Sequence, residues 1–288
     1  MGVDGLWPLL QGAAKQLDLK AGDAQGLRLG IDTYVLLHAA AADYGVAIDM
    51  VVRGQPAPMN AVARVAHAFE KLREWGVTAV AFFDGAPRPY KLGEVNTRGA
   101  KRSEAAAKAR ELFSSSQHSK EMREQARAAA RVTPELRRAT IYELKKAGVP
   151  VVGAPYEADG QLAWAFKQKK IGAVLTVDGD LLVLGCKVFR LRNGDPFGWM
   201  RSGCLDVYDM PALASLAAGA VPAEPDLAWA VSTFGCGVLT DYGVLCGCDF
   251  NLHKGFRGVG PTSAWAILLE VGRGAGGGWR PASGRPHA

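Results

Sequence analysis

The chain has 288 residues, 49% of them hydrophobic and 22% charged, with a formal net charge of +6 at pH 7 and a pI near 9.1. This length and composition predict an ordinary globular protein with a large core, most simply one domain with a lobe or tail. They exclude a membrane-spanning protein, because no apolar run approaches the length of a spanning helix. Asp4 and Pro8 interrupt the apolar stretch that a signal peptide needs, so we expect an intracellular protein.

The positive charge and the cysteines narrow the function further. Between Arg88 and Arg138 there are thirteen Lys and Arg against six Asp and Glu, which leaves the rest of the chain slightly acidic. A basic element on an acidic body is compatible with a polyanionic partner such as nucleic acid. The cysteines form no CxxC pair, so we expect reduced thiols rather than disulfides or a zinc site. They are Cys186, Cys204, Cys236, Cys246 and Cys248.

The first half of the chain alternates apolar runs with amphipathic segments. The expected elements are strands at 27–31 and 78–83 and helices at 33–42 and 61–75. Asn60 is expected to cap the second helix and Gly76 to end it. Strand, helix, strand in this order predicts a parallel crossover unit, which gathers functional residues at the carboxyl ends of its strands. Asp32 and Asp84 are at such ends, although an acid there can also serve as a cap or turn residue.

The basic segment from Arg88 to about Val132 is rich in Ala, Arg, Lys and Glu. This composition favours helix but offers little apolar face to bury. A solvated helical hairpin, with a turn at 114–116, and a disordered linker are both compatible with it. The functional interpretation is a mobile basic clamp over a nucleic-acid path.

The second half continues the alternation. Thr133 and Pro134 carry the capping chemistry of a helix that ends near Gly148. The further expected elements are strands at 149–152 and 173–177, a helix between them up to about 170, and a turn and strand within 181–191. Residues 193–230 are rich in Pro, Gly and Ala and predict no element.

The C-terminal part combines another acid with a glycine turn. Asp249 follows an apolar segment at 242–247. Gly258 and Gly260 form a Gly-x-Gly turn before a helix expected from about 262 to 271, and such a turn exposes backbone N–H groups that can bind phosphate. The chain has no GxxxxGK[ST] motif, which argues against a nucleotide triphosphatase.

Asp178 and Asp180 flank a glycine at the end of the strand expected over 173–177. In an extended segment, residues i and i+2 point to the same side, so we expect the two carboxylates to face one place. Like charges this close are unfavourable unless cations neutralise them, and a hard metal ion is the natural counterion. The alternative is a solvated Asp-Gly-Asp turn.

Other segments also carry acids at the ends of apolar runs, which favours the metal interpretation. The seven candidate metal ligands are Asp32, Asp84, Glu157, Asp159, Asp178, Asp180 and Asp249. Such a pocket needs about two divalent cations, the arrangement used for in-line hydrolysis of phosphodiesters. One ion would activate a water molecule and the other would stabilise the leaving oxygen. The five histidines are scattered and suggest neither a Ser-His-Asp nor a Cys-His site.

With these residues assembled, the chain resembles the XPG/flap-endonuclease family of structure-specific 5′ nucleases. The matching segments occur in family order over residues 1 to about 270: Met1–Leu6, Ile31–Tyr34 with Leu37 and His38, Phe83–Gly85, Ala154–Asp159, Asp178–Leu182 with Gly185–Lys187, and Gly247–Phe250 with Arg257–Gly260. Together these motifs are highly specific. Tyr156 and the run 184–187 are more similar to the exonuclease branch than to the flap endonucleases.

The resemblance implies an α/β fold, with a central, mainly parallel twisted sheet flanked by helices in a PIN-like nuclease core. It implies a 5′ nuclease domain over 1–271, in which residues of about 88–132 form a basic helical arch. Residues of about 240–271 would form a helix-two-turn-helix element that binds DNA. The remaining residues, 272–288, are expected to be a disordered Gly/Arg/Pro tail.

The resemblance also assigns roles to individual residues. It implies that the seven acids bind two Mg²⁺ ions, directly or through water, and that Mn²⁺ can substitute. Lys91 and Arg98 match arch residues that reach the scissile phosphate and stabilise developing charge there. His38 matches a residue that stacks on the base near the cut. The other matched DNA-binding positions are Gly2, Tyr34, Lys101, Arg102, Arg257, Gly258 and Gly260, and the turn around Val259 can bind K⁺ in this family. If the family resemblance is set aside, Lys91 and Arg98 are interpreted as solvated charges on a helix, and His38 as a packed helix residue.

The chain departs from the family pattern at several places. The segment 250–256 is about two residues longer than usual, and Gly179 replaces a bulkier residue between the paired acids. Gly93 and Gly99 are expected to soften the arch. Family members continue after the turn with more helices, whereas this chain changes to Gly-Arg-Pro sequence, which suggests a truncated or mis-spliced product.

We therefore expect a magnesium-dependent DNA nuclease acting on double-stranded DNA with 5′ ends, nicks or flaps, in repair, replication or recombination. It is expected to be nuclear and monomeric and to bind no membrane, with repair proteins as partners although no recruiting tail is seen. One alternative is a flap endonuclease, separable by comparing degradation of recessed duplex with cleavage of a long flap. Another is a catalytically inactive relative that binds DNA junctions.

Overall fold

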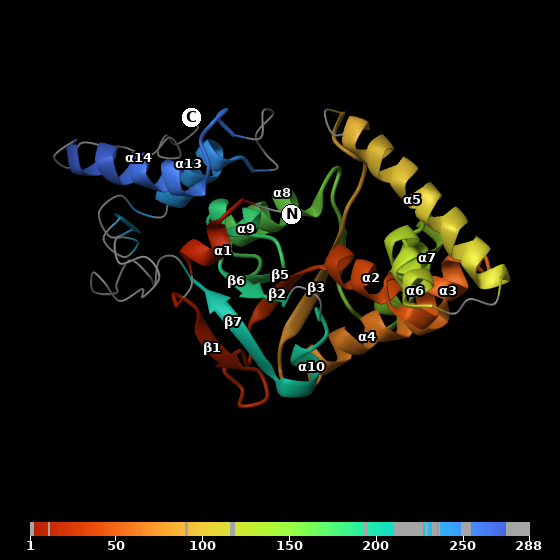
Figure 1. Ribbon diagram of the computed structural model, residues 1–288. Helices are drawn as coiled ribbons and strands as arrows, with labels where there is room; N and C mark the ends of the chain where they lie inside the picture. Colours follow the sequence, from red (N-terminus) through yellow and green to blue (C-terminus); the bar gives the residue numbers. More distant parts are fainter. Residues whose placement is uncertain are drawn as a thin grey trace. The chain divides into compact units, whose positions relative to one another are not determined.

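The computed structural model divides the chain into two compact units (Figure 1). Unit 1 comprises Met1–Asp18, Leu162–Arg190 and Cys204–Ala288, and unit 2 comprises Leu19–Gln161 and Leu191–Gly203. The residues that the structure describes are 3–10, 12–89, 92–115, 119–192, 195–209, 227, 230–231, 235, 237–248 and 255–274. We describe each unit by itself.

Unit 2 contains three parallel strands. They are β2 (Arg28–Asp32), β3 (Thr78–Phe83) and β4 (Val151–Gly153), and Asp32 pairs with Phe82 where β2 ends. Every residue of β2 and β3 except the first is buried, as is typical of parallel strands. Parallel strands need crossover connections, here containing α4 (Met59–Glu74) and α7 (Pro134–Lys146). The predicted parallel crossover is confirmed.

The ends of these helices test the predicted caps. The helix α7 begins as expected, because the Thr133 hydroxyl accepts a hydrogen bond of 3.0 Å from the Leu136 N–H and Pro134 follows the cap. Gly76, with φ +73°, follows the end of α4. The prediction that Asn60 caps α4 is wrong: the cap is Pro58, and Asn60 lies inside the first turn. Pro58 has the extended backbone typical of an N-cap residue, with φ −60° and ψ 126°, and no side chain caps the helix at this position.

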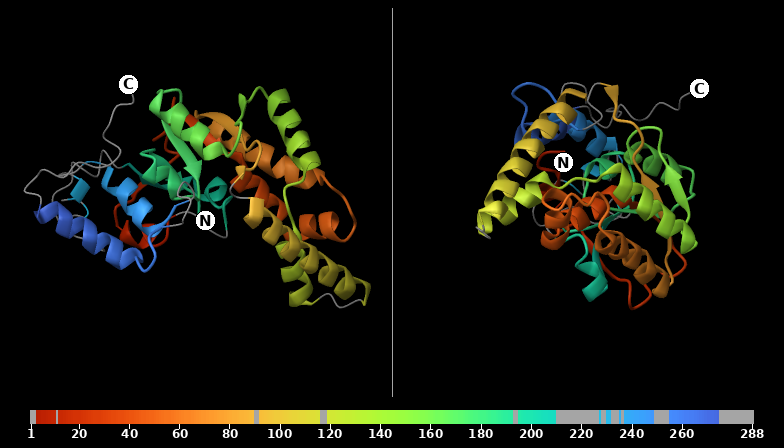
Figure 2. Two further views of the ribbon diagram at one scale, coloured as in Figure 1. Left: turned by 90° about the horizontal axis from the view of Figure 1, so that it is seen from above. Right: turned by 90° about the vertical axis from the view of Figure 1, so that its right-hand side faces the viewer.

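The basic insert folds as a hairpin of α5 (Leu92–Ser114) and α6 (Lys120–Ala129) (Figure 1, Figure 2). It does have a face to bury, contrary to the sequence expectation, but that face is made mainly of alanine. This cluster joins the hairpin to α3 (Tyr44–Val51) and consists of Ala47, Ile48, Val51, Ala105, Ala109, Met122, Ala126 and Ala129. No element is expected from the sequence between α2 (Thr33–Ala41) and α4, so α3 is missed.

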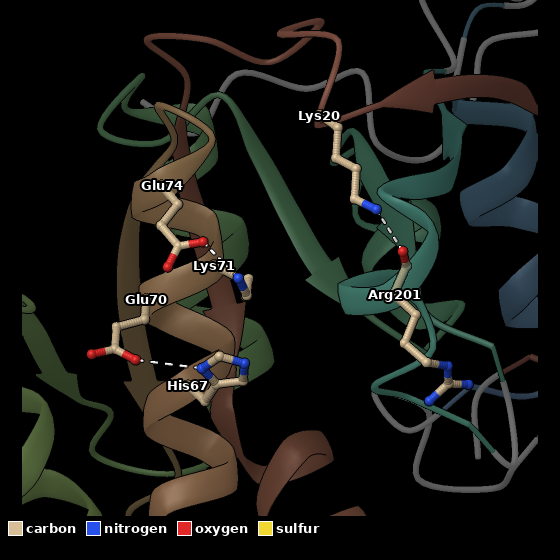
Figure 3. Close-up of polar contacts among 6 residues, drawn as sticks. All are labelled: Lys20, His67, Glu70, Lys71, Glu74 and Arg201. Carbon is tan, nitrogen blue, oxygen red and sulfur yellow. Dashed lines mark hydrogen bonds and ion pairs between the residues drawn. The ribbon is translucent and has the colours of Figure 1, made fainter.

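Residues 191–203 complete unit 2 and end in the short helix α10 (Trp199–Ser202). The Lys20 ammonium donates to the Arg201 carbonyl at 2.6 Å (Figure 3), and the Trp199 ring packs edge-on against Trp75 with centroids 5.9 Å apart. Figure 3 also shows the ion pairs of α4, His67 with Glu70 and Lys71 with Glu74. Exposed pairs of this kind contribute little to the free energy of unfolding. The contact between Trp75 and Trp199 and the buried strands therefore contribute more to the stability of unit 2.

Unit 1 is built on four strands in the order β1 (Lys15–Asp18), β7 (Cys204–Tyr208), β6 (Val188–Arg190) and β5 (Ala173–Thr176). β5 and β6 are parallel, whereas β7 is antiparallel to both of its neighbours. Among the residues that the structure describes, its helices include α1 (Leu6–Leu9), most of α8 (Ala158–Lys167), α9 (Asp180–Val183), α13 (Gly237–Cys246) and α14 (Pro261–Gly274). β1 and β7 were not predicted, because both contain residues exposed to solvent and form no apolar run.

The predicted α/β class is confirmed, since each unit combines helices with a sheet that is parallel at least in part. Among the helices described, none is by itself both long and apolar enough to cross a membrane. The cysteines Cys186, Cys204, Cys246 and Cys248 form no disulfide with one another, and Cys236 lies outside the described residues.

We expect Met122→Ala to lower the free energy of unfolding by about 2–5 kcal/mol, because Met122 is fully buried where α6 meets α3 and α5. Met59→Ala is the matched control, since Met59 is 59% exposed and its loss should change stability by about 0.5 kcal/mol or less. Urea unfolding, with hydrogen exchange of the α5 and α6 amides, measures both. Equal behaviour of the two variants would contradict the packing of the hairpin.

Candidate active site

Two of the predicted acids follow neighbouring strands of unit 2. Asp32 is the last residue of β2 and the N-cap residue of α2, and it is 8% exposed. Asp84 follows directly after β3, whose Phe82 pairs with Asp32. Because the carboxyl ends of adjacent parallel strands share one edge of a sheet, both acids lie at that edge.

Two further acids lie at the start of α8, beside Asp84. The Asp84 Oδ1 accepts a hydrogen bond of 2.7 Å from the Ala158 N–H, which ties the strand end to the first turn of this helix. Glu157 lies 3.1 Å from the Nε of Arg88 through its Oε2, and both side chains are mostly buried. Asp159 is in the first turn. The bond to Ala158 therefore joins Asp84 to the residue between Glu157 and Asp159.

The paired acids of unit 1 are both buried: Asp178 is 8% exposed and Asp180 is 0% exposed. The expectation that they sit on an extended segment is wrong, because β5 ends at Thr176 and Gly179 has helical φ and ψ of −76° and −19°. A hydrogen bond of 3.0 Å from the Asp180 N–H to the Asp178 Oδ1 joins the pair instead. The Thr176 hydroxyl accepts from the Asp178 N–H at 3.1 Å and continues this turn.

The seven predicted ligands are distributed over both units. Asp32, Asp84, Glu157 and Asp159 belong to unit 2, Asp178 and Asp180 belong to unit 1, and Asp249 lies outside the described residues. Within neither unit do three or more of the described His, Cys, Asp and Glu residues form a group that could hold a metal ion. The meeting of all seven acids therefore stays a prediction.

The chemistry of the donors fits a hard divalent cation. Every predicted ligand offers carboxylate oxygens, which Mg²⁺ and Mn²⁺ prefer over nitrogen and sulfur. Burial of the Asp180 charge, in the same turn as Asp178, costs free energy that a nearby cation offsets. The residues present are therefore suited to the metal ions that the family resemblance implies.

Aromatic and cationic side chains surround the edge that holds Asp84. The Tyr34 ring lies 6.0 Å from that of His38 and meets Phe83 edge-on at 6.4 Å, measured between centroids. Burial raises the pKa of the Tyr34 hydroxyl; Arg137 opposes this through its charge and a hydrogen bond, and the charge of Asp84 adds to it. Tyr34 is thus within electrostatic reach of both a cation from α7 and an acid from β3.

His38 faces positive charge from α5. Desolvation lowers the pKa of its imidazole, and the guanidinium groups of Arg102 and Arg98 lower it further. Arg98 and Lys101 are exposed and Arg102 is half-buried, so this part of α5 presents cations beside α2. Lys91 and Gly2, predicted at the phosphate and near the site, lie outside the described residues.

The predicted glycine turn precedes α14 in unit 1. Gly258 has φ +83°, and Arg257, Gly258 and Gly260 are exposed. α14 then begins at Pro261 and packs against α13, where Tyr242 meets Trp265 with centroids 6.2 Å apart. An exposed turn at the start of a helix can offer N–H groups to phosphate. The proposed K⁺ site stays a prediction, and part of its loop, 249–254, lies outside the described residues.

Sequence reasoning missed Arg88 and Arg137, which contact predicted site residues. Arg88 counts there only as part of the basic segment, and Arg137-Arg138 has the form of a surface pair. Arg138 is indeed exposed and lies 2.8 Å from Glu135, whereas Arg137 reaches Tyr34. The signal that separates them is helical phase, because Arg137 lies three residues before the buried Thr140 and shares its face of α7.

Two family models match the chain. The XPG N-terminal domain matches residues 1–105, and the XPG I-region matches residues 148–198. Together they cover more than half of the chain. They include every predicted metal ligand except Asp249.

Curated sequences similar to this chain include exonucleases and a flap endonuclease. Exonuclease 1 of Arabidopsis thaliana is 29% identical over 272 residues, or 94% of this chain. Exodeoxyribonuclease 1 of Schizosaccharomyces pombe is 31% identical over 198 residues, and Flap endonuclease 1 of Plasmodium knowlesi is 29% identical over 205 residues, each covering 69% of this chain. The chain spans 33%, 33% and 32% of the length of these relatives.

Solved structures share the fold at low sequence identity. The catalytic core of Rad2 in complex with DNA substrate is 17% identical with a TM-score of 0.60, over 94% of this chain and 69% of that one. Human GEN1 in complex with Holliday junction DNA is 19% identical with a TM-score of 0.56, over 93% and 55%. The flap endonuclease-1 of Methanococcus jannaschii is also 19% identical, with a TM-score of 0.53, over 91% and 76%. With both XPG regions matched in order and this fold shared, the chain belongs to the XPG family.

Proposed function

We propose that the chain is a structure-specific DNA nuclease that hydrolyses phosphodiesters at the 5′ ends, nicks and 5′ flaps of double-stranded DNA. It would combine 5′-to-3′ exonuclease with 5′ flap endonuclease activity, in nuclear DNA repair, replication or recombination. The observation that supports this most directly is the position of the described acids, each at the end of a strand or in the segment that follows one, and within a matched XPG region. Relatives named exonuclease 1 and flap endonuclease 1 support the same reaction.

Nucleases of this family are metal-dependent. We assign two Mg²⁺ ions, replaceable by Mn²⁺, to carboxylates that bind them directly or through water. The proposed ligands are Asp32, Asp84, Glu157, Asp159, Asp178, Asp180 and Asp249. When bound, such ions activate a water molecule and neutralise charge on the phosphate. The contribution of the chain is to hold its carboxylates in place, as the bonds of Asp84 to Ala158 and of Asp178 to Asp180 do.

The remaining predicted residues would bind and orient the DNA. Lys91 and Arg98 would stabilise charge on the scissile phosphate, and Lys101 and Arg102, which share α5 with Arg98, would contact the strand. His38 would stack on the base beside the cut and Tyr34 would contact the DNA, and the lowered pKa of His38 favours the neutral form of its ring. In unit 1, Arg257 and the glycines at 258 and 260 would contact duplex phosphates, with K⁺ in this turn, and Gly2 would lie near the cut.

We expect Asp84→Asn and Asp178→Asn each to lower magnesium-dependent cleavage of a 5′-flap DNA by at least about a hundredfold. Asparagine keeps the Oδ1 that accepts from Ala158 or Asp180, so the fold is retained while the charge is lost. Asp49→Asn, which removes an acid paired with Arg53 on α3, is the control and should cleave like wild type. Cleavage by either site variant at the wild-type rate would contradict the proposed role.

A flap endonuclease is the second candidate, because the Plasmodium knowlesi enzyme of that name matches 69% of the chain. End-labelled recessed duplex and a long single-stranded flap separate the two activities. We expect stepwise release of nucleotides from the recessed 5′ end, as well as cleavage of the flap. Cleavage of the flap alone would favour the second candidate, and DNA binding without cleavage by wild type would indicate an inactive relative.

We expect the pKa of His38 to lie below its ordinary value, and Arg102→Gln to raise it. The folded protein disfavours the charged form of the His38 ring. The stability that the neutral ring contributes is therefore present above the ordinary histidine pKa and is lost as the pH falls from that value through the lowered one. NMR titration of the histidine rings measures this shift. Glu135→Gln, a charge change on the outer face of α7, is the control, and an unchanged His38 pKa in Arg102→Gln would contradict the electrostatic coupling.

A further inference from the structure

The turn between the paired acids of unit 1 packs tightly against α1. A Cβ atom on Gly179 would lie 2.8 Å from the Leu6 Cδ2 and 3.7 Å from the Trp7 ring atoms Cε2 and Cζ2. Leu6 is fully buried, so its Cδ2 could make room for a side chain at 179 only by displacing the residues packed around it. The φ of Gly179, −76°, is open to any residue, so close packing and not backbone conformation requires glycine here.

The Trp7 indole is held on other sides by the sheet of unit 1. The Arg190 guanidinium, at the end of β6, lies 3.9 Å from the centroid of the indole, and the Tyr208 ring, at the end of β7, lies 5.2 Å from it. Cation–π and aromatic contacts of this kind restrict the ring to one orientation. Trp7 therefore packs against the ends of β6 and β7 on one side and faces the turn at Gly179 on the other.

The segment after the paired acids is held at its other end by α13. The Thr240 hydroxyl donates to the Val183 carbonyl at 2.7 Å, and a Cβ on Gly243 would lie 2.9 Å from the Val183 Cγ1. The Tyr242 hydroxyl donates to the Asp4 carbonyl at 3.2 Å, which joins α13 to the start of α1. The stretch from Asp178 to Val183 is thus fixed from both ends by elements distant in sequence.

We propose that Trp7 is a positioning residue for the paired acids, acting through its packing beside the turn at Gly179. Together with Leu6 it holds the turn so that the carboxylates of Asp178 and Asp180 are arranged for a divalent cation before the ion binds. Such preorganisation strengthens binding because less conformational freedom is lost on association. The inference rests on the proposed role of Asp178 and Asp180 as metal ligands.

The direct test is to measure Mn²⁺ binding to the purified Gly179→Ala variant, using electron paramagnetic resonance to quantify the free ion. We expect Mn²⁺ affinity to fall by about tenfold or more, and the Mg²⁺ concentration for half-maximal flap cleavage to rise with it, while kcat at saturating Mg²⁺ changes less. Leu6→Ala removes the Cδ2 that the new Cβ meets. The double variant Leu6→Ala/Gly179→Ala should therefore lose less affinity than the two single variants combined.

The controls separate positioning from a general loss of structure. Gly45→Ala adds a methyl group whose nearest contact is an ordinary 3.8 Å from Asp43, so Mn²⁺ affinity should be unchanged. Trp7→Phe keeps an aromatic ring and should retain more affinity than Trp7→Ala, with both variants checked for folding by thermal unfolding. Wild-type Mn²⁺ affinity in Gly179→Ala, or equal losses in Trp7→Phe and Trp7→Ala, would overturn the proposal.

Asp178→Asn distinguishes this inference from the proposed function on which it rests. If that variant binds Mn²⁺ like wild type, the paired acids are not the binding site and the inference fails. If wild type binds Mn²⁺ in a manner that requires Asp178 but cleaves no DNA, the nuclease proposal fails and the positioning role of Trp7 stands.

Discussion

Burial of negative charge at strand ends is the constraint that shapes both units. Asp32 and Asp180 are almost inaccessible to water, and a carboxylate removed from water is costly unless hydrogen bonds and cations compensate. Backbone N–H groups compensate in part, at Ala158 for Asp84 and at Asp180 for Asp178. A backbone N–H supplies only a partial charge, however, so full compensation requires cations. Arg88 is one such cation in unit 2, and divalent ions would be the others.

The hairpin of α5 and α6 is rich in positive rather than negative charge. Its many cations must stay in water while the hairpin itself is held in place by packing. Alanine allows this: Ala105, Ala109, Ala126 and Ala129 bring the helix backbones close to α3 without a wide apolar face. The remaining faces of α5 and α6 stay free for lysine and arginine. The fixed position of α5 then brings Arg98 and Arg102 within electrostatic reach of His38. The small buried alanines therefore fix the position of the hairpin, and this leaves its lysines and arginines exposed.

The sequence predicts what depends on local pattern. β2, β3 and β5 are short and largely apolar, and the cap at Thr133 uses residues adjacent in the chain. These features can therefore be predicted from the sequence. α3, β1 and β7 were not, because their pairing partners decide their conformation and their own patterns are weak. The same limit applies to Arg137 and Arg138, two equal charges in sequence that tertiary packing sends to different neighbours. Whether the acids of the two units meet depends on contacts that no local pattern records.

Gly179 shows how a departure from a family pattern acquires a physical reason. By resemblance, a bulkier residue stands between the paired acids, and its loss in isolation would leave the turn less constrained. Here the space that a side chain would occupy is filled from the opposite side by Leu6 and Trp7, and the indole is large enough to contact Arg190 and Tyr208 as well. Close packing tolerates exchanges that conserve volume across a contact. The small residue in the turn and the large residues on α1 therefore form one packing unit, in which Leu6 and Trp7 lie beside the space that a side chain at residue 179 would take.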